Sequence, residues 1–137
     1  MIYVDGASSG SSTPAAVAIT GGTVAAAVVF TKNINAQTGG TYTFALTDTY
    51  ESGTQLCTFG NGSATTVTVP KNSSIALPIG CCINCQQVGA GKVTFAAEDG
   101  SVTINPVATL AISAQWGGAS LVQTAANVWS LIGSLSA

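Results

Sequence analysis

Thr66-Val67-Thr68-Val69-Pro70 is the stretch that decides the fold class of this 137-residue chain. Valine and threonine alternate along it, and both side chains are branched at Cβ, which is typical of a β-strand with one buried face. Pro70 has no backbone N–H to donate to a neighbouring strand, so it predicts the end of that strand. The stretch therefore favours a sheet in which the two valines point into a core.

The same alternation recurs along most of the chain, in short runs with apolar residues at every second position. No segment has the 3.6-residue period of an amphipathic helix. These runs predict many short strands, each with one side facing a core. The apolar positions of the runs are Tyr42, Phe44, Leu46, Ile75, Leu77, Ile79, Ile83, Cys85, Val93, Phe95, Val102, Ile104, Leu110, Ile112, Ala114, Trp129 and Leu131.

Turn sequences separate the runs. Asn61-Gly62 is typical of a β-hairpin, and Gly89-Ala90-Gly91 offers glycines that can adopt a positive φ. Asp99-Gly100 and Gly117-Gly118 predict further turns. Short strands at this spacing predict an all-β fold, namely a single β-sandwich or jelly-roll-like domain over residues 35–137.

Residues 1–34 have a different composition and predict an extended N-terminal arm. Residues 6–13 are rich in glycine and serine, like a flexible linker, whereas residues 14–30 are mostly alanine and valine. Gly21-Gly22 interrupts any helical period there. An arm this apolar needs a partner surface, and the candidate contact residues are Val17, Ile19, Val24, Val28 and Phe30.

The arm has the pattern of neither a membrane helix nor a signal peptide. A membrane helix needs ~20 continuous apolar residues, and residues 20–23 interrupt the apolar stretch. A signal peptide begins with basic residues, whereas the first basic residue here is Lys32. We therefore expect a protein made in the cytoplasm that has no membrane partner.

Charged residues are scarce: they make up 6% of the chain, against about 25% of an average soluble domain. The chain has three Lys or Arg residues, five Asp or Glu residues and no histidine. Three scattered cations do not form the basic surface that nucleic acid requires. Because monomers usually carry more charge for solubility, the composition favours obligate assembly over a monomer with an uncharged polar surface.

The four cysteines include a Cys-x-x-Cys sequence, Cys82-Ile83-Asn84-Cys85. In a strand, successive side chains point to opposite faces, so Cys82 and Cys85 would point apart, which argues against a zinc site or a redox pair. Cys81, Ile83 and Cys85 would share the buried face. Free structural cysteines are therefore favoured, with a disulfide or a four-cysteine metal site as alternatives, and we expect no metal and no cofactor.

The carboxylates do not predict an active site. They are Asp5, Asp48, Glu51, Glu98 and Asp99, and nothing in the sequence brings two of them together. Histidine, the usual general base, is absent from the chain. We therefore expect a protein that is not an enzyme.

Trp116 precedes Gly117-Gly118 and allows two interpretations. A surface tryptophan could stack on a sugar, which would be typical of a carbohydrate-binding module. The favoured interpretation places Trp116 in a core layer or at a subunit interface, where aromatic residues are enriched. Trp129 is predicted to fill the core between two sheets.

Several segments, taken in order, resemble a small β domain common in the virion proteins of tailed bacteriophages. That domain reads roughly TVTVP-NSS, P-G, Q-GAG-VT, GVTI and a closing W-L-G-L, and the resemblance covers about residues 35–136. Residues 14–23 resemble a short stretch frequent in phage tail-fibre proteins. The matching segments of this chain are 66–74, 78–80, 87–94, 101–105 and 129–135.

This resemblance implies a non-enzymatic virion protein, often trimeric, that decorates the head or forms part of a fibre. Fibre chains with this domain are typically longer, so the resemblance favours a capsid decoration (cement) protein that binds the outside of the head shell through its N-terminal arm and stabilises it. Its partners would be its own copies, as a homotrimer, and the major capsid protein. It would be made in the host cytoplasm and lie on the capsid surface. The alternative is a tail-fibre or adsorption component that could bind a host surface glycan.

Overall fold

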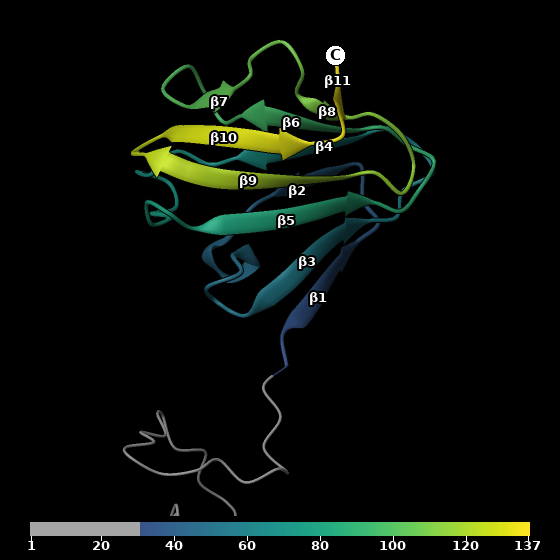
Figure 1. Ribbon diagram of the computed structural model, residues 1–137, viewed down its shortest axis with the longest axis horizontal. Helices are drawn as coiled ribbons and strands as arrows, with labels where there is room; N and C mark the ends of the chain where they lie inside the picture. Colours follow the sequence, from purple (N-terminus) through teal and green to yellow (C-terminus); the bar gives the residue numbers. More distant parts are fainter. Residues whose placement is uncertain (1–30) are drawn as a thin grey trace, which may run out of the picture. The chain divides into compact units, whose positions relative to one another are not determined.

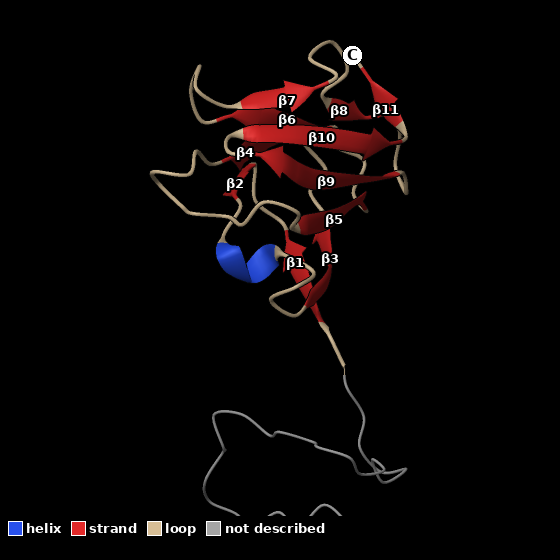
Figure 2. Cartoon of the chain, turned by 60° about the vertical axis from the view of Figure 1, so that its left-hand side comes forward, coloured by secondary structure: helices blue, strands red, loops and turns tan. Residues whose placement is uncertain are grey.

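The computed structural model of the chain describes residues 31–137, and Lys32–Ala137 form one compact unit made almost entirely of strands (Figures 1 and 2). The one helical element among the described residues is a short 3-10 turn, η2, Leu46–Asp48. The predicted all-β fold class is thus confirmed. The strands are β1 (Asn33–Gln37), β2 (Thr41–Thr43), β3 (Thr54–Phe59), β4 (Thr65–Val69), β5 (Cys82–Gln87), β6 (Val93–Ala97), β7 (Thr103–Asn105), β8 (Ala111–Ile112), β9 (Gly118–Ala125), β10 (Val128–Gly133) and β11 (Leu135–Ser136).

The strands form two sheets. One has six strands in the order β1-β3-β5-β9-β10-β7, and the other has five in the order β11-β8-β6-β4-β2. In Figure 1, β5, β9 and β10 lie in front of β2, β4 and β6. The first six strands alternate between the sheets, and neighbours within each sheet are parallel: β1 with β3, β3 with β5, β2 with β4, and β4 with β6. The chain therefore winds through three successive coils, like a solenoid.

After β6 most of the pairs are antiparallel, but β7, the edge strand of the six-stranded sheet, pairs with β10 in parallel. The antiparallel pairs join β9 with β5 and β10, and β8 with β6 and β11. The prediction of a sandwich or jelly roll is therefore confirmed only in its coarser part, an all-β structure with two sheets. The strands of a jelly roll are antiparallel, whereas neighbouring strands of the first three coils here are parallel. Alternating hydrophobicity indicates a strand, but it does not predict which other strand pairs with it or whether the pair is parallel or antiparallel.

The turns that lead from the six-stranded to the five-stranded sheet stack on one another. Gly60 N donates a hydrogen bond to Gln37 O at 2.8 Å, and Gly89 N donates one to Phe59 O at 2.9 Å. Asn61-Gly62 therefore joins strands of different sheets, and its prediction as a β-hairpin is wrong. The Asn-Gly pair identifies a turn correctly, but a turn within a solenoid coil has the same residue preferences.

Gly89 and Gly91 have a different role from the one predicted. Neither has a positive φ. A Cβ atom on Gly89 would overlap the backbone of Asn61, and one on Gly91 would overlap the carbonyl group of Ser63. The third turn thus needs glycine because the second turn lies directly against its backbone.

The two sheets share one hydrophobic core. Trp129 is fully buried, as predicted. The rings of Phe44 and Phe95 stack with their centroids 6.4 Å apart. Burying each side chain of this size contributes roughly 1.5–3 kcal/mol, so these rings are major contributors to the stability of the fold. The core also contains Cys57, Phe59, Val67, Val69, Leu77, Cys81, Ile83, Cys85, Val93, Val102, Ile104, Ile112, Ala119, Leu121 and Leu131.

Candidate functional site

The predicted arm contacts lie outside the described residues. Val17, Ile19, Val24, Val28 and Phe30 all precede residue 31. The predicted boundary between residues 34 and 35 falls inside β1, whose first residue is Asn33. Candidate sites are therefore built from the two sheets and the loops that join them.

The cysteines lie where the strand pattern of β5 predicts. Cys81, Ile83 and Cys85 are buried, and Cys82 is half-buried on the opposite side of the strand. Cys57 of β3 is the direct partner of Cys85 in the parallel pairing of these strands, so both thiols enter the core side by side. All four cysteines are free.

The environment of the thiols makes them poor nucleophiles. Burial, with the nearby charge of Asp48, raises the pKa of Cys57 to about 12. Burial raises the pKa of Cys81 to about 11 and that of Cys85 well above its usual range. The pKa of Cys82 is also raised, by burial and by Glu51. Because the thiolate is the reactive form, these side chains act at neutral pH as small apolar groups.

Asp48 is the centre of a buried polar cluster between the first strands of the two sheets. Its Oδ1 accepts a hydrogen bond from Asn35 Nδ2 at 2.7 Å, and its Oδ2 accepts from the Tyr42 hydroxyl at 2.8 Å and from Ala45 N at 2.7 Å. Burial and the hydrogen bond to Asp48 raise the pKa of Tyr42 to about 12. Asp48 is only 3% exposed, and its hydrogen bonds join the first strands of the two sheets.

A hollow of about 440 Å³ lies beside this cluster, lined by Asn33, Ile34, Asn35, Tyr42, Thr47, Asp48, Ser52 and Thr54. Some of its polar groups bond within the protein: Asn35 Nδ2 also donates to the Tyr42 hydroxyl, and Thr54 Oγ1 donates to Thr47 O. A neighbouring aromatic contact places Lys32 Nζ 4.0 Å from the centre of the Tyr50 ring. These contacts stabilise the loops around η2.

A second charged group lies in the loops after β4 and β6. Lys71 Nζ is 2.7 Å from Asp99 Oδ2, and Lys71 N donates to Glu98 Oε2 at 2.8 Å. The bonds from Lys71 and Ser101 hold the pKa of Asp99 well below its usual range. Lys71 of one loop is thus joined to Glu98 and Asp99 of the other, and Ser101 bonds to Asp99 within its own loop. The turn predicted at Asp99-Gly100 is present in the loop after β6.

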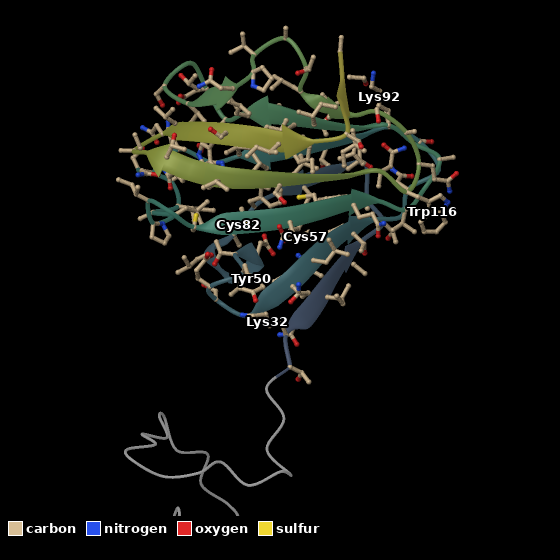
Figure 3. The ribbon with its side chains drawn as sticks, viewed as in Figure 1. Lys32, Tyr50, Cys57, Cys82, Lys92 and Trp116 are labelled. Atoms are coloured by element: carbon tan, nitrogen blue, oxygen red, sulfur yellow. The ribbon has the colours of Figure 1, made fainter. Side chains whose placement is uncertain are left out.

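Trp116 does not lie in the core: it is 63% exposed in the turn before β9, with a φ of 68° (Figure 3). The prediction of a core position for Trp116 is therefore wrong, and a subunit interface or a sugar contact remain as proposals. The turn holds the residue by backbone bonds, since Trp116 N donates to Gln87 O at 2.6 Å. The other large hydrophobic side chains that are exposed are Ile34, Leu46, Tyr50, Ile79, Val107 and Ile132.

No protein-family model, no curated protein and no solved structure matches this chain. Among residues 31–137, no three His, Cys, Asp or Glu side chains are grouped so that they could hold a metal ion. No helix in the described part of the chain has the length and apolar character needed to span a membrane. Function must therefore be argued from the surface of the two sheets.

The outer faces of the two sheets differ in chemistry. On the five-stranded sheet, threonines lie side by side, with Thr41 next to Thr66 and Thr66 next to Thr94. The outer face of the six-stranded sheet carries aliphatic side chains as well as polar ones. We call this surface the outer six-strand face, and its residues are Ile34, Ala36, Leu56, Thr58, Cys82, Asn84, Gln86, Gly118, Ser120, Val122, Ser130 and Ile132.

The sequence predicts neither the Asp48 cluster nor the outer six-strand face. The cluster joins Asn35, Tyr42 and Asp48, and the spacing of these residues follows no known motif. Its only sequence signal is an acidic residue in a region otherwise almost free of charge. The face depends on the order of strands in the sheet, because Ile34 and Ile132 are nearly a hundred positions apart in the chain.

Proposed function

We propose that this chain is a non-enzymatic structural protein of a bacteriophage particle, and specifically a capsid decoration protein. The observation that carries the proposal is the surface of the domain: large apolar side chains such as Ile34 and Ile132 are more than half exposed, on a chain of which only 6% is charged. Exposed apolar side chains of this kind mark surfaces that bind other proteins. The resemblance of residues 66–105 and 129–135 to the phage virion domain supports the same role.

The proposed partners are further copies of the chain, as a homotrimer, and the major capsid protein of the head. In this proposal the arm, residues 1–34, binds the outside of the shell through Val17, Ile19, Val24, Val28 and Phe30, and the strand domain associates with its copies. We class the domain as a β-sandwich whose first half is wound like a solenoid. A protein that binds only the assembled shell stabilises it by mass action. The protein would be made in the host cytoplasm and would act at the capsid surface.

The experiment that tests this function measures binding of the purified protein to tail-free heads and, in parallel, to isolated tails. Saturable binding to heads alone, with a rise in the temperature at which the heads lose their DNA, is the expected result. A double variant of the arm, Ile19→Asp with Val28→Asp, should lose that binding. Thr68→Asp, on the outer face of the five-stranded sheet, is the matched control and should retain it.

One observation favours a second function, in the adsorption apparatus. The exposed indole of Trp116, held in a turn with a fixed backbone, is suited to stacking on a sugar ring. Binding to tails or to host cells, lost in Trp116→Ala and absent for heads, would replace the decoration role with a tail-fibre component that binds a host surface glycan.

A further inference from the structure

The turn at Asn61-Gly62, which joins β3 to β4, is a sequence motif that the proposed function leaves unused. Asn61 is half-buried, whereas Gly62 and Ser63 are exposed. Ser63 N donates a hydrogen bond to Asn61 Oδ1 at 3.0 Å, a contact in which an asparagine side chain folds back onto the backbone two residues on. The side-chain amide of Asn61 therefore lies alongside the Gly62 peptide, as an attack by the backbone on the side chain requires.

Three atoms decide whether an asparagine reacts with its own backbone: the nitrogen of the next residue, the amide carbon and the amide nitrogen that leaves. Gly62 N donates no hydrogen bond to any of residues 31–137, so this nitrogen is available as a nucleophile. Asn61 Nδ2 has no acceptor in the same part of the chain, so nothing there holds the leaving group.

The amide carbon, Cγ of Asn61, is polarised by the hydrogen bond from Ser63 N. Attack on Cγ moves negative charge onto Oδ1, and a donor already placed at an oxygen where charge develops stabilises the transition state. A reaction between groups of one chain also avoids the entropic cost of bringing two molecules together. The turn thus combines a free nucleophile, a polarised carbonyl group and an unheld leaving group.

The turn also leaves room for the ring that such an attack forms. Nothing lies within 4 Å of the position that a Cβ atom would take on Gly62. Every residue other than glycine would place a side chain beside the attacking nitrogen. The preceding turn contributes Gly40, whose own Cβ position is 3.9 Å from Asn61 Nδ2, so the departing group faces an exposed glycine.

We propose that Asn61 is a modification site at which the folded protein undergoes spontaneous deamidation to aspartate and isoaspartate. Gly62 N forms a bond to Cγ of Asn61, the bond from Cγ to Nδ2 breaks, and Nδ2 leaves as ammonia with the proton that Gly62 N gives up. One water molecule then opens the resulting succinimide ring. The reaction consumes one water and releases one ammonia, without an oxidant or a second protein. The inference concerns the lifetime of the fold and goes beyond the proposed function.

The two products differ in their effect on the stacked turns. Opening of the ring at Cγ gives aspartate, which keeps the length of the backbone and can still accept from Ser63 N. Opening at the main-chain carbonyl carbon gives isoaspartate, in which the backbone passes through the side chain and is one carbon longer. Gly91 N donates to Asn61 O at 3.0 Å, and a Cβ atom on Gly89 would overlap the backbone of Asn61. A longer turn has no free space here, so isoaspartate should break that hydrogen bond and separate the coils.

Asn72 is the internal comparison, because it is followed by Ser73 and is held by the fold. Asn72 Oδ1 lies 2.9 Å from the side-chain amide of Gln123, which is fully buried. Asn72 N donates to Asn127 Oδ1 at 2.7 Å. Both the side chain and the backbone of Asn72 are therefore fixed, and the fold should protect this residue while it leaves Asn61 reactive.

The test is mass spectrometry of the full chain during incubation at pH 8, in native buffer and, in parallel, in urea. Replacement of an amide by an acid raises the mass, and fragmentation assigns the change to a residue. Asn61 should convert in the native protein at a rate similar to that in urea, whereas Asn72 should convert more slowly in the native protein than in urea. An Asn61 that stays intact in the native protein while it converts in urea would overturn the proposal, because the fold would then protect it.

Gly62→Ala is the matched variant for the role of the Gly62 nitrogen. The added methyl group enters open space, so the variant should fold like the unmodified protein, which circular dichroism checks. The same methyl group hinders the approach of the nitrogen to Cγ, so the conversion of Asn61 should be several-fold slower. Equal rates in the two proteins would overturn the assignment of this nitrogen as the nucleophile.

The effect on the stacked turns has its own measurement. An L-isoaspartyl methyltransferase, which methylates the carboxylate of isoaspartate, counts this product in the aged protein, with aged Gly62→Ala as the background. Freshly purified Asn61→Asp carries the charge of the product without the extra backbone carbon. The aged protein should unfold at a lower temperature than Asn61→Asp, in proportion to its isoaspartate content. The same unfolding temperature in both would overturn the predicted separation of the coils.

Discussion

The Tyr42 hydroxyl lies 2.8 Å from Oδ2 of Asp48, and through this hydrogen bond the first strand of the five-stranded sheet is fastened to the loop that follows it. Asn35, on the first strand of the six-stranded sheet, donates to the other oxygen of the same carboxylate. One buried carboxylate therefore ties the first strands of both sheets together at the end where the solenoid begins.

Removal of this carboxylate should destabilise the domain. In Asp48→Ala, the three donors that it satisfies lose their partner, and a buried polar group without a partner costs about 1–3 kcal/mol. We expect the free energy of unfolding to fall by about 3 kcal/mol. Tyr42→Phe removes two hydrogen bonds, the one donated to Asp48 and the one accepted from Asn35, and should cost about 1–2 kcal/mol. Urea unfolding followed by circular dichroism measures both values.

Thr47→Ala is the control for the Asp48 cluster, since Thr47 is exposed and adjacent and surface substitutions usually change stability by less than about 0.5 kcal/mol. An Asp48→Ala variant as stable as the control would show that the cluster contributes nothing to the fold.

Alkaline pH should destabilise the fold because several buried acids are held in their neutral form. Burial raises the pKa of Tyr42 and of Cys57 to about 12, and that of Cys81 to about 11. In the unfolded chain, thiols ionise near pH 8.5 and tyrosine near pH 10. The stability that these groups contribute is therefore fully present below about pH 8.5 and is lost as the pH rises toward 12. The midpoint of urea unfolding should fall steadily over that range.

Cys57→Val tests the assignment, because it keeps an apolar side chain in the core and removes one of the titrating groups. Its unfolding midpoint should fall less steeply above pH 9 than that of the unmodified protein. Identical slopes would show that Cys57 is not held neutral by the fold. Samples returned to pH 8 before a second measurement control for irreversible damage.

Glycine at position 91 should be essential for the stacking of the coils. Gly91→Ala would place a Cβ atom on the carbonyl group of Ser63, and Gly89→Ala would do the same against Asn61. Overpacking of this kind costs about 1–3 kcal/mol, so we expect the unfolding temperature to fall by roughly 5–15 °C in each variant. Gly62→Ala is the matched control, because nothing lies within 4 Å of its Cβ position. Calorimetry that gave the same temperature for Gly91→Ala and Gly62→Ala would contradict the stacked-turn explanation.

The sequence predicts several strands correctly, but it misses others and does not predict the partners of any. The run at residues 75–79, predicted as a strand, lies in a loop with Ile79 exposed, and β1, β3 and β9 are strands that the predicted runs do not include. Val67 and Val69 face the core and Thr66 faces solvent, as the alternation requires, because side-chain direction is a local property of an extended chain. The pairing of β4 with β2 and β6 in parallel is not local: it depends on turns that carry the chain from one sheet to the other. Asn61-Gly62 has the same composition as a hairpin turn, so the residues alone favour the wrong connection.

The same distinction applies to the candidate surfaces. The opposite directions of Cys82 and Cys85 follow from positions within one strand, and the structure confirms them. The pairing of Cys57 with Cys85, and the placement of Ile34 and Ile132 on one face, arise only when β1, β3, β5, β9 and β10 take their order in the sheet. The core position, one of the two places considered for Trp116, is wrong because its place in a tight turn keeps the side chain on the surface.

Acid should weaken the link between the loops after β4 and β6. The pKa of Asp99 is lowered by hydrogen bonds from Lys71 and Ser101, and the pKa of Glu98 is lowered by bonds from Ser74 and from the backbone of Lys71. An acid whose pKa is lower in the folded state contributes stability above its unfolded pKa, near 4, and loses it as the pH falls. The contribution is small, because water screens an exposed ion pair. The urea midpoint should therefore be level from pH 7 to about 5 and decline below pH 4.

Asp99→Asn should start from a slightly lower midpoint at pH 7 and decline less. A decline that is the same in both proteins would assign the acid sensitivity to carboxylates other than Asp99.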